Sequence, residues 1–247
     1  GMHALWSVGG FAGAGLFGIW VGTFSLTPLL STIIAAAIMV LVTLAASRHL
    51  LPYGGDAGGK LLALPKGIVT FVGIIACIAF LVEGAIMDWG GVFLTTVRHF
   101  DMSLAGTAFT VFSAAMLTMR LFGDWTVQKL GQERVVIGGS LLAVAGFLLV
   151  IFAAEPALLY LGFFAIGIGC ANVVPVFFSL LGKQRVMPIS LAVPAVSTLG
   201  YLGILMGPAV IGFIAHQTSL YTAFGLLAFL VLLQSIIAAY VYRHILD

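Results

Sequence analysis

The chain has 247 residues, of which 62% are hydrophobic and 7% are charged, and its formal net charge is +2. A soluble domain carries about 25% charged residues, so this composition excludes a water-soluble globular protein. Its apolar runs are continuous rather than alternating, which predicts an all-α, polytopic membrane protein and not a barrel. The small positive charge is spread over short loops and is not a nucleic-acid-binding surface.

Eight membrane spans are predicted, because a helix needs about 20 apolar residues to cross a bilayer. In chain order they cover residues 4–23, 28–47, 67–94, 104–122, 135–153, 157–181, 190–215 and 219–242. No basic segment precedes the first span and further spans follow it, which argues against a cleavable signal peptide. Since the chain opens with Gly1 almost inside a span, we expect it to be part of a longer polypeptide.

The basic residues predict the orientation of these spans. With eight crossings, nine of the ten Lys and Arg residues fall on one face of the membrane, and Arg98 falls on the other. Positively charged loops face the cytoplasm, so both termini and the loops 48–66, 123–134 and 182–189 are expected there. Pro28, Pro156 and Pro188 lie at or beside span boundaries, where a missing N–H costs least.

The longest loop, residues 48–66, is rich in glycine and is interpreted as a flexible linker. It divides the chain into residues 1–47, with two spans, and residues 67–247, with six. Residues 7–13 and 197–203 share the pattern Ser-x-x-Gly-aromatic-x-Gly, and each copy is followed by one more span. Spans one and two are therefore interpreted as counterparts of spans seven and eight in an incomplete repeat. Chance similarity between Gly-rich helices is the alternative.

Six spans, a linker and a preceding partial copy resemble the major facilitator superfamily, taken as helices 5–12 of twelve. The strings HALWSVGG at 3–10, EGAIMDW at 83–89 and RLFGDW at 120–125 resemble its MosC-like bacterial inner-membrane subgroup. The resemblance implies two bundles, a partial N-terminal one and a complete six-helix C-terminal one. It also implies a cytoplasmic-membrane transporter of a small solute, with a hint of sugar-like or cyclitol-like compounds.

Glu83 is the leading candidate for a functional residue. It lies roughly 22 Å into its span, well inside the hydrocarbon core, where a carboxyl must be paired, protonated or wetted. We expect it to couple protons or to bind substrate; the alternative is a structural carboxyl bonded to a neighbouring helix. Asp88 points about 140° away from Glu83. With Trp89 it is either an outer gate, re-aimed by a helix break at Gly90 and Gly91, or an interfacial acid beside a belt tryptophan.

Further candidates lie in the later spans. Asn172 precedes Pro175, which frees a backbone carbonyl one turn back, so its amide is expected to bond either a substrate hydroxyl or that carbonyl. Tyr201 is a candidate cavity residue within a Gly-rich stripe that we interpret mainly as a helix-packing face. Thr107, Thr110, Ser113 and Gln234 are weaker candidates for lining a cavity.

The loop 123–134 resembles the superfamily's cytoplasmic signature Gly-x-x-x-Asp-Arg-x-Gly-Arg-Arg in a degraded form. Aligned on Gly131, Lys129 matches the first basic position, Arg134 comes one residue late, and Asp124 lies one turn before the missing carboxylate. The resemblance implies a cytoplasmic gate formed by Asp124, Lys129 and Arg134. The alternative is a solvated loop whose charges only set topology.

The histidines and the two cysteines, Cys77 and Cys170, show no metal-ligand spacing, and no phosphate-binding or hydrolase motif is present. No metal, cofactor or enzymatic activity is therefore expected. We predict a secondary active transporter that moves its solute by alternating access, coupled to protons through Glu83. The alternatives are a truncated membrane protein that does not transport and, from a third class, an intramembrane enzyme.

Overall fold

A computed structural model describes the chain apart from residues 1–8, 10–15, 17–18, 21–22, 50–63 and 246–247. The chain divides into two compact units, Leu5–Leu61 and the remainder, which joins Gly1–Ala4 to Leu62–Asp247. The predicted first span and the first copy of the repeat motif fall largely outside the described residues, as does most of the predicted linker.

The smaller unit contains α2 (Pro28–Ser47), which matches the predicted span 28–47. Pro28 occupies the first turn, and the Thr27 hydroxyl accepts a hydrogen bond from the backbone N–H of Leu30 at 3.2 Å. Both features favour a helix start at this point. The side chains along α2 are apolar and nearly all exposed, as expected for a helix whose surroundings are lipid.

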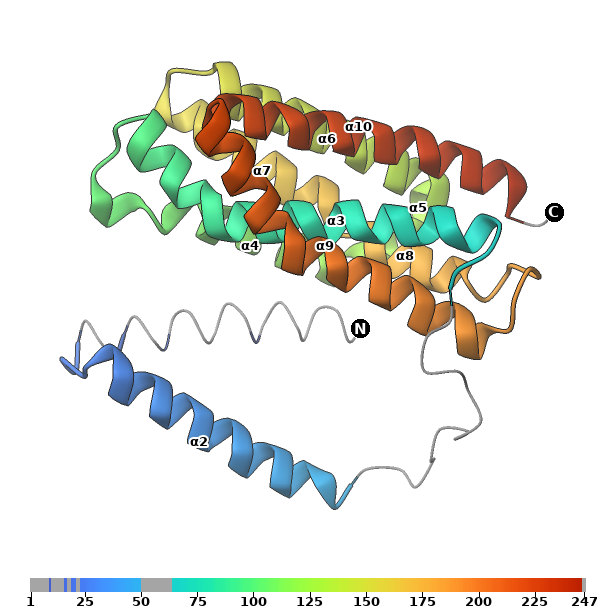
Figure 1. The fold of residues 1–247 in the computed structure, drawn as a ribbon, viewed down its shortest axis with the longest axis horizontal. Helices are drawn as coiled ribbons and strands as arrows, with labels where there is room; N and C mark the ends of the chain where they lie inside the picture. Colours follow the sequence, from blue (N-terminus) through green and yellow to red (C-terminus); the bar gives the residue numbers. More distant parts are fainter. Residues whose placement is uncertain (1–8, 10–15, 17–18, 21–22, 50–63, 246–247) are drawn as a thin grey trace. The chain divides into compact units, whose positions relative to one another are not determined.

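The larger unit is also helical (Figure 1). Its elements are α3 (Ile68–Val92), the π-helix η1 (Phe93–Val97), the 3₁₀ turn η2 (Met102–Leu104), α4 (Thr107–Leu121), α5 (Gly123–Leu130), α6 (Gln132–Phe152), α7 (Pro156–Cys170), α8 (Val173–Leu180), α9 (Ile189–Gln217) and α10 (Leu220–His244). Six helical segments of the described chain are long and apolar enough to cross a membrane: α2, α3 with η1, α6, α7 with α8, α9 and α10.

One predicted loop contains a short helix, and one predicted crossing is an interrupted helix. Within the predicted loop 123–134, Gly123–Leu130 forms α5, and only Phe122 separates it from α4. The predicted span 157–181 is broken at Ala171 and Asn172, between α7 and α8. Pro175 supplies the reason for this break, because it has no N–H to donate to the carbonyl of Ala171.

The helix expected to break at Gly90 and Gly91 does not do so. α3 runs through both glycines to Val92 and continues as the π-helix η1. Arg98, just beyond η1, donates from Nη2 to the carbonyls of Val150 at 2.8 Å and Ile151 at 2.6 Å. A cation at the last carbonyls of a helix stabilises its negative end, so Arg98 caps α6.

Helix pairs α3–α9 and α6–α7 make the most extensive contacts in the larger unit. On α9, Gly203 packs against the Cys77 carbonyl of α3, and Gly200 and Gly207 pack against Phe80 and Leu81. The predicted Gly-rich packing face is thereby confirmed. Lipid gives little hydrophobic drive for helices to associate, so such close backbone approach is what holds them together.

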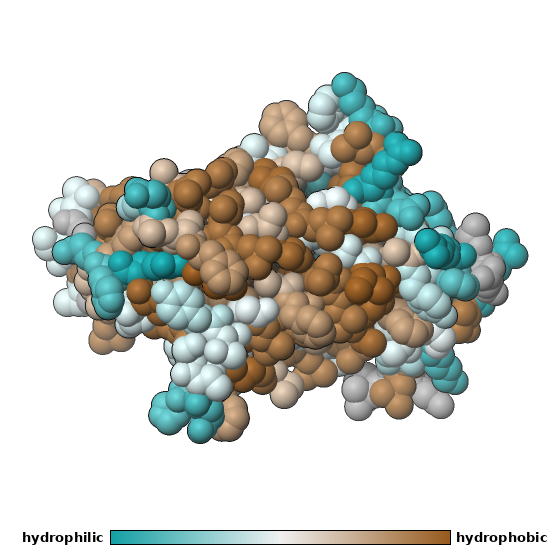
Figure 2. Space-filling view, turned by 90° about the horizontal axis from the view of Figure 1, so that it is seen from above, coloured by the Kyte–Doolittle hydropathy of each residue, from teal (hydrophilic) through white to brown (hydrophobic). Residues whose placement is uncertain are grey.

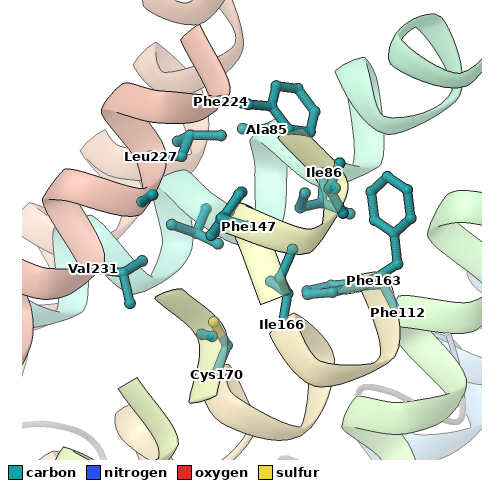
Figure 3. Close-up of a cluster of buried hydrophobic side chains, with 14 of the residues drawn as sticks. Ala85, Ile86, Phe112, Phe147, Phe163, Ile166, Cys170, Phe224, Leu227 and Val231 are labelled. Carbon is teal, nitrogen blue, oxygen red and sulfur yellow. The ribbon is translucent and has the colours of Figure 1, made fainter. Parts of the chain in front are cut away.

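Buried side chains form two clusters in the larger unit. One gathers aromatic residues from several helices, including Phe112, Phe147, Phe163 and Phe224 (Figure 3). The other lies around the beginning of α3, α8 and the ends of α9 and α10 that pack there. On the visible surface, apolar side chains cover the middle and hydrophilic ones gather towards the ends, as expected for helices with lipid along their length (Figure 2).

Candidate substrate and proton-coupling site

Glu83 lies near the middle of the crossing Ile68–Val97, as the sequence predicted. Its neighbours on α3, Val82, Gly84, Ala85 and Ile86, are all buried. A run of buried apolar residues on both sides leaves the carboxylate far from either end of the helix. An ionised group at such a place needs a partner within the protein.

The partner is Arg120 on α4. Its Nη2 lies 3.5 Å from Glu83 Oε2, and the two side chains are 5% and 19% exposed respectively. The sequence placed Arg120 among the basic residues on the cytoplasmic face, and this is wrong: the guanidinium lies inside the helix bundle. The sequence did not predict Arg120 as a site residue, because it lies near the end of a predicted span, where basic residues usually determine membrane topology.

Arg120 also contacts the broken crossing formed by α7 and α8. Its Nε donates to the Ala171 carbonyl at 3.3 Å. This is the carbonyl that Pro175 leaves without a helical donor. Arg120 therefore links α4 to α3 through the ion pair with Glu83 and to the α7–α8 break through a hydrogen bond.

Asn172, the next residue, is 6% exposed. One predicted role, bonding the freed carbonyl, is taken by Arg120 instead. The Asn172 amide nitrogen, Nδ2, has no hydrogen-bond partner among the residues that the structure describes. A buried amide without a partner is costly, so it marks a position where another group is expected to bind.

The two helix breaks face each other. Gly123 opens α5, and a Cβ added to it would lie 2.6 Å from Asn172 Oδ1. Only glycine permits this approach. The close packing brings the start of α5 against the start of α8, beside the Glu83–Arg120 pair. Of the four residues predicted to bind substrate or protons, Glu83 and Asn172 thus lie at one centre, joined there by Arg120.

Asp88 and Tyr201 lie away from that centre. Asp88 is exposed on α3. Its neighbour Trp89 donates from Nε1 to the Pro208 carbonyl at 2.9 Å and fastens α3 to α9. Tyr201 is 55% exposed and its ring stacks on Phe80 at 5.8 Å. Because Phe80 is one turn from Glu83 on α3, Tyr201 borders the same side of that helix.

Three of the weaker polar candidates make hydrogen bonds to other helices or to their own, although Gln234 Oε1 has no partner among the described residues. Gln234 is buried and donates from Nε2 to Ser140 Oγ at 3.0 Å, joining α10 to α6. The hydroxyls of Thr107 and Tyr160 lie 3.0 Å apart, and Thr110 donates to the Gly106 carbonyl. Gln234 and Thr107 thus join neighbouring helices, Thr110 bonds its own helix, and Ser113 is half-buried; a cavity-lining role for these residues stays a prediction.

The predicted cytoplasmic gate residues stand at the ends of α5 and the beginning of α6. Asp124 is in the first turn of α5 and Lys129 in its last, an arrangement that complements the helix dipole. Lys129 Nζ lies 4.3 Å from the centre of the Trp125 ring. Arg134 is exposed, and no ion pair links these three among the contacts of the described residues. Their role as a gate stays a prediction.

Within the described ranges, no three His, Cys, Asp or Glu side chains are grouped so as to hold a metal ion. The centre consists instead of one acid, one guanidinium, one amide and a broken backbone, enclosed by membrane-crossing helices. Such a group of residues is typical of a multi-pass membrane protein that handles a polar or charged solute.

Comparison with protein-family models identifies the family. The model of the Major Facilitator Superfamily matches residues 72–245, and the chain belongs to that family. An uncharacterised MFS-type transporter of Yersinia pestis is 43% identical over 94% of this chain and 60% of its own length. An uncharacterised transporter of Sinorhizobium fredii is 31% identical over 96% of this chain and 63% of its own length.

Membrane protein MosC of Rhizobium meliloti is 29% identical over 60% of this chain and 36% of its own length. The predicted family and its MosC-like resemblance are thus confirmed. A crystal structure of the peptide transporter POT with sulfate superposes with a TM-score of 0.59 at 22% identity, over 80% of this chain and 41% of that one. At this identity the likeness concerns the fold. The chain spans about three fifths of the length of the first two relatives.

Proposed function

We propose that the protein is a secondary active transporter that moves a small polar solute across the bacterial cytoplasmic membrane, coupled to protons through Glu83. The observation that carries the proposal is the ion pair between Glu83 and Arg120 in the middle of the bundle. Membrane helices rarely contain ionisable residues, and those that do usually serve a transport pathway. The broken crossings beside the pair suit a midplane binding site.

The coupling step requires that one member of the pair change its charge. Arginine keeps its proton in proteins, so Glu83 is the group that binds and releases one. Protonation removes the attraction that holds the carboxyl beside Arg120. Arg120 also donates a hydrogen bond to the Ala171 carbonyl at the α7–α8 break. A change in the protonation state of Glu83 would therefore alter the contacts of Arg120 with this discontinuous helix.

Alternating access and the cargo belong to the same proposal. Two bundles would rock about the site, with residues 1–47 in one, residues 67–247 forming the other and residues 48–66 as the cytoplasmic linker. Both ends of this chain would face the cytoplasm. Resemblance to the MosC-like subgroup favours a sugar-like or cyclitol-like solute. Asp124, Lys129 and Arg134 would close the cytoplasmic face.

A second reading is a membrane protein that shares the fold and does not transport. Solute uptake by the full-length protein in proteoliposomes separates the two, because the transport reading requires accumulation against a gradient when the outside is made acidic.

Glu83→Gln tests the coupling role. The amide keeps the size of the side chain and cannot take up a proton at physiological pH. We expect uphill uptake driven by a proton gradient to be lost in proteoliposomes, while exchange of solute between the two sides persists. Glu155→Gln is the matched control, since it makes the same chemical change at an exposed carboxyl outside the site. Uphill uptake at the wild-type rate by Glu83→Gln would remove Glu83 from the mechanism.

A further inference from the structure

The turn between α8 and α9 presents two cations on a fixed backbone. Lys183 and Arg185 are exposed, and Gln184 between them is buried. The Gln184 side chain donates from Nε2 to the Met187 carbonyl at 2.6 Å. Its Oε1 accepts from the backbone N–H groups of Val186 at 2.8 Å and Met187 at 3.0 Å. Because one buried amide makes three hydrogen bonds within the turn, the two cations stand on a preorganised backbone.

A third cation lies at the beginning of α3, beside this turn. Gly67 packs against the side chain of Val186, since a Cβ added to Gly67 would lie 3.1 Å from Val186 Cγ1. Lys66 precedes Gly67 and is exposed. Beyond the turn, the Lys183 ammonium donates to Gln132 Oε1 at 3.5 Å, at the beginning of α6. Folding thus brings cations from two distant segments to one end of the larger unit (Figure 1).

These three cations have no carboxylate partner within the part of the chain that the structure describes. None of them forms a salt bridge there. An ammonium has three N–H donors and a guanidinium has five, so most of their donors are available to another molecule. Cations that are gathered without counter-ions create a positive potential, which attracts an anionic group.

Apolar side chains are exposed among the cations. Val186 follows Arg185 directly, Ile189 opens α9, and Leu64 lies two residues before Lys66; all three apolar side chains are exposed. A free phosphate ion offers these side chains nothing to contact. A phospholipid joins an anionic head to apolar chains, so it matches both parts of this surface.

The depth of the turn agrees with the headgroup region of a bilayer. The turn lies between the ends of two apolar crossings, Pro156–Leu180 and Ile189–Gln217. At the same end of the unit, α5 carries an exposed tryptophan, Trp125, with the Lys129 ammonium 4.3 Å from its ring centre. Tryptophan and basic side chains are typical of the boundary between membrane and water. Lipid phosphates lie at this same level.

We propose that Lys66, Lys183 and Arg185 bind the phosphate of an anionic phospholipid, whose acyl chains lie against Val186 and Ile189. Basic surfaces at the cytoplasmic ends of membrane helices are suited to such headgroups. A zwitterionic lipid binds less well, because its own ammonium group offsets the attraction of its phosphate. The proposal adds a lipid partner to the protein and depends neither on the transported solute nor on proton coupling.

Binding of single lipids to the full-length protein in a neutral detergent tests the proposal, with native mass spectrometry as the readout. Dioleoyl phosphatidylglycerol is compared with dioleoyl phosphatidylcholine, which has the same chains and no net charge. It is also compared with glycerol phosphate, which has the phosphate and no chains. We expect phosphatidylglycerol to bind most tightly, and its advantage to shrink as salt screens the charges.

The variant Lys183→Gln with Arg185→Gln removes both cations of the turn. One cation near an anionic lipid surface gives about a fivefold gain in affinity, so this double variant should bind phosphatidylglycerol about twentyfold more weakly. Arg48→Gln with Arg243→Gln is the matched control, since it removes two exposed cations outside the turn and should bind nearly as the wild type does.

Gln184→Leu separates the shape of the turn from its charge. It keeps every cation and removes the three hydrogen bonds of the Gln184 side chain, so it should also weaken binding of phosphatidylglycerol. Melting temperatures without added lipid identify which variants are folded. If Gln184→Leu does not fold, the double variant and its control decide the question.

Equal binding of phosphatidylglycerol and phosphatidylcholine by the wild type would overturn the proposal. An undiminished preference in the Lys183→Gln, Arg185→Gln variant would do the same. An equal loss in the control variant would show that only total charge matters and would also reject the site. Glycerol phosphate that binds as tightly as phosphatidylglycerol would indicate a phosphate site in place of a lipid site.

Discussion

The hydrogen bond and the ion pair described for Arg120 both depend on the shape of its guanidinium. Nε donates to the Ala171 carbonyl while Nη2 faces Glu83. A guanidinium directs several N–H groups outward in one plane, so it can serve two acceptors on different helices at once. The ammonium of a lysine is a compact charge that would not hold both acceptors in the same geometry.

Replacing Arg120 should therefore lower the stability of the fold, by an amount that depends on which contacts the new side chain loses. Arg120→Lys should lower the free energy of unfolding by about 1–2 kcal/mol through loss of one hydrogen bond. Arg120→Met should cost about 3 kcal/mol or more, because Glu83 is left buried without a partner. Adding Glu83→Gln to Arg120→Met should recover part of that loss. Thermal unfolding in detergent measures all three, and a wild-type melting temperature for Arg120→Met would refute the pairing.

Among the helical elements, the interrupted crossings and the continuous ones have different roles. α4 with α5 and α7 with α8 place their breaks at the site, where an irregular backbone offers polar groups to a solute. α3 and α9 instead run past each other without interruption, held by glycine contacts and by the Trp89 bond to Pro208. The uninterrupted α3–α9 pair thus lies beside helices that are broken at the site.

The α3–α9 contact should be sensitive to a single methyl group. In Gly203→Ala the new Cβ would overlap the Cys77 carbonyl, so the helices must separate. We expect a loss of about 1–3 kcal/mol in the free energy of unfolding, measured by thermal denaturation in detergent. Gly225→Ala on α10 is the control, since its Cβ would meet nothing within 4 Å, and it should be neutral or slightly stabilising.

Over the whole molecule, orientation follows from where the loop charges lie. Arg120 and Arg98 are committed to contacts within the larger unit, so they no longer count as loop signals. In the larger unit, Lys66 precedes α3 and Lys183 follows α8, and both lie in loops predicted to be cytoplasmic. Lys183 Nζ is 3.5 Å from Gln132 Oε1, which joins two of the turns expected on that face.

Cysteine labelling tests this orientation. Lys183→Cys in intact cells should resist a membrane-impermeant thiol reagent and react after permeabilisation, whereas Glu155→Cys, on the expected outer face, should react at once. Both positions are exposed, and the native Cys77 and Cys170 lie inside crossings and provide the background signal. Rapid labelling of Lys183→Cys from outside would reverse the proposed topology.

Membrane class, the approximate extent of most crossings and the packing role of the glycines could be predicted from the sequence. α2 begins and ends where predicted, and Pro28, Pro156 and Pro188 stand at helix starts. These features depend on local properties: the length of an apolar run, a missing N–H, a missing Cβ. Glu83 was identified for the same reason, since an acid amid apolar residues is visible without any partner.

Only the tertiary structure decided what Glu83 faces. A basic residue near the end of a span has the same local signature whether it points to the cytoplasm or into the bundle, so Arg120 was assigned to the wrong place. Likewise, Pro175 predicted a backbone carbonyl without a helical donor, but the sequence did not show that Arg120, on a different helix, would donate to that carbonyl. Hydropathy describes the transfer of each residue into lipid by itself. The stability of a buried charge depends instead on partner atoms that folding brings together from distant positions in the chain.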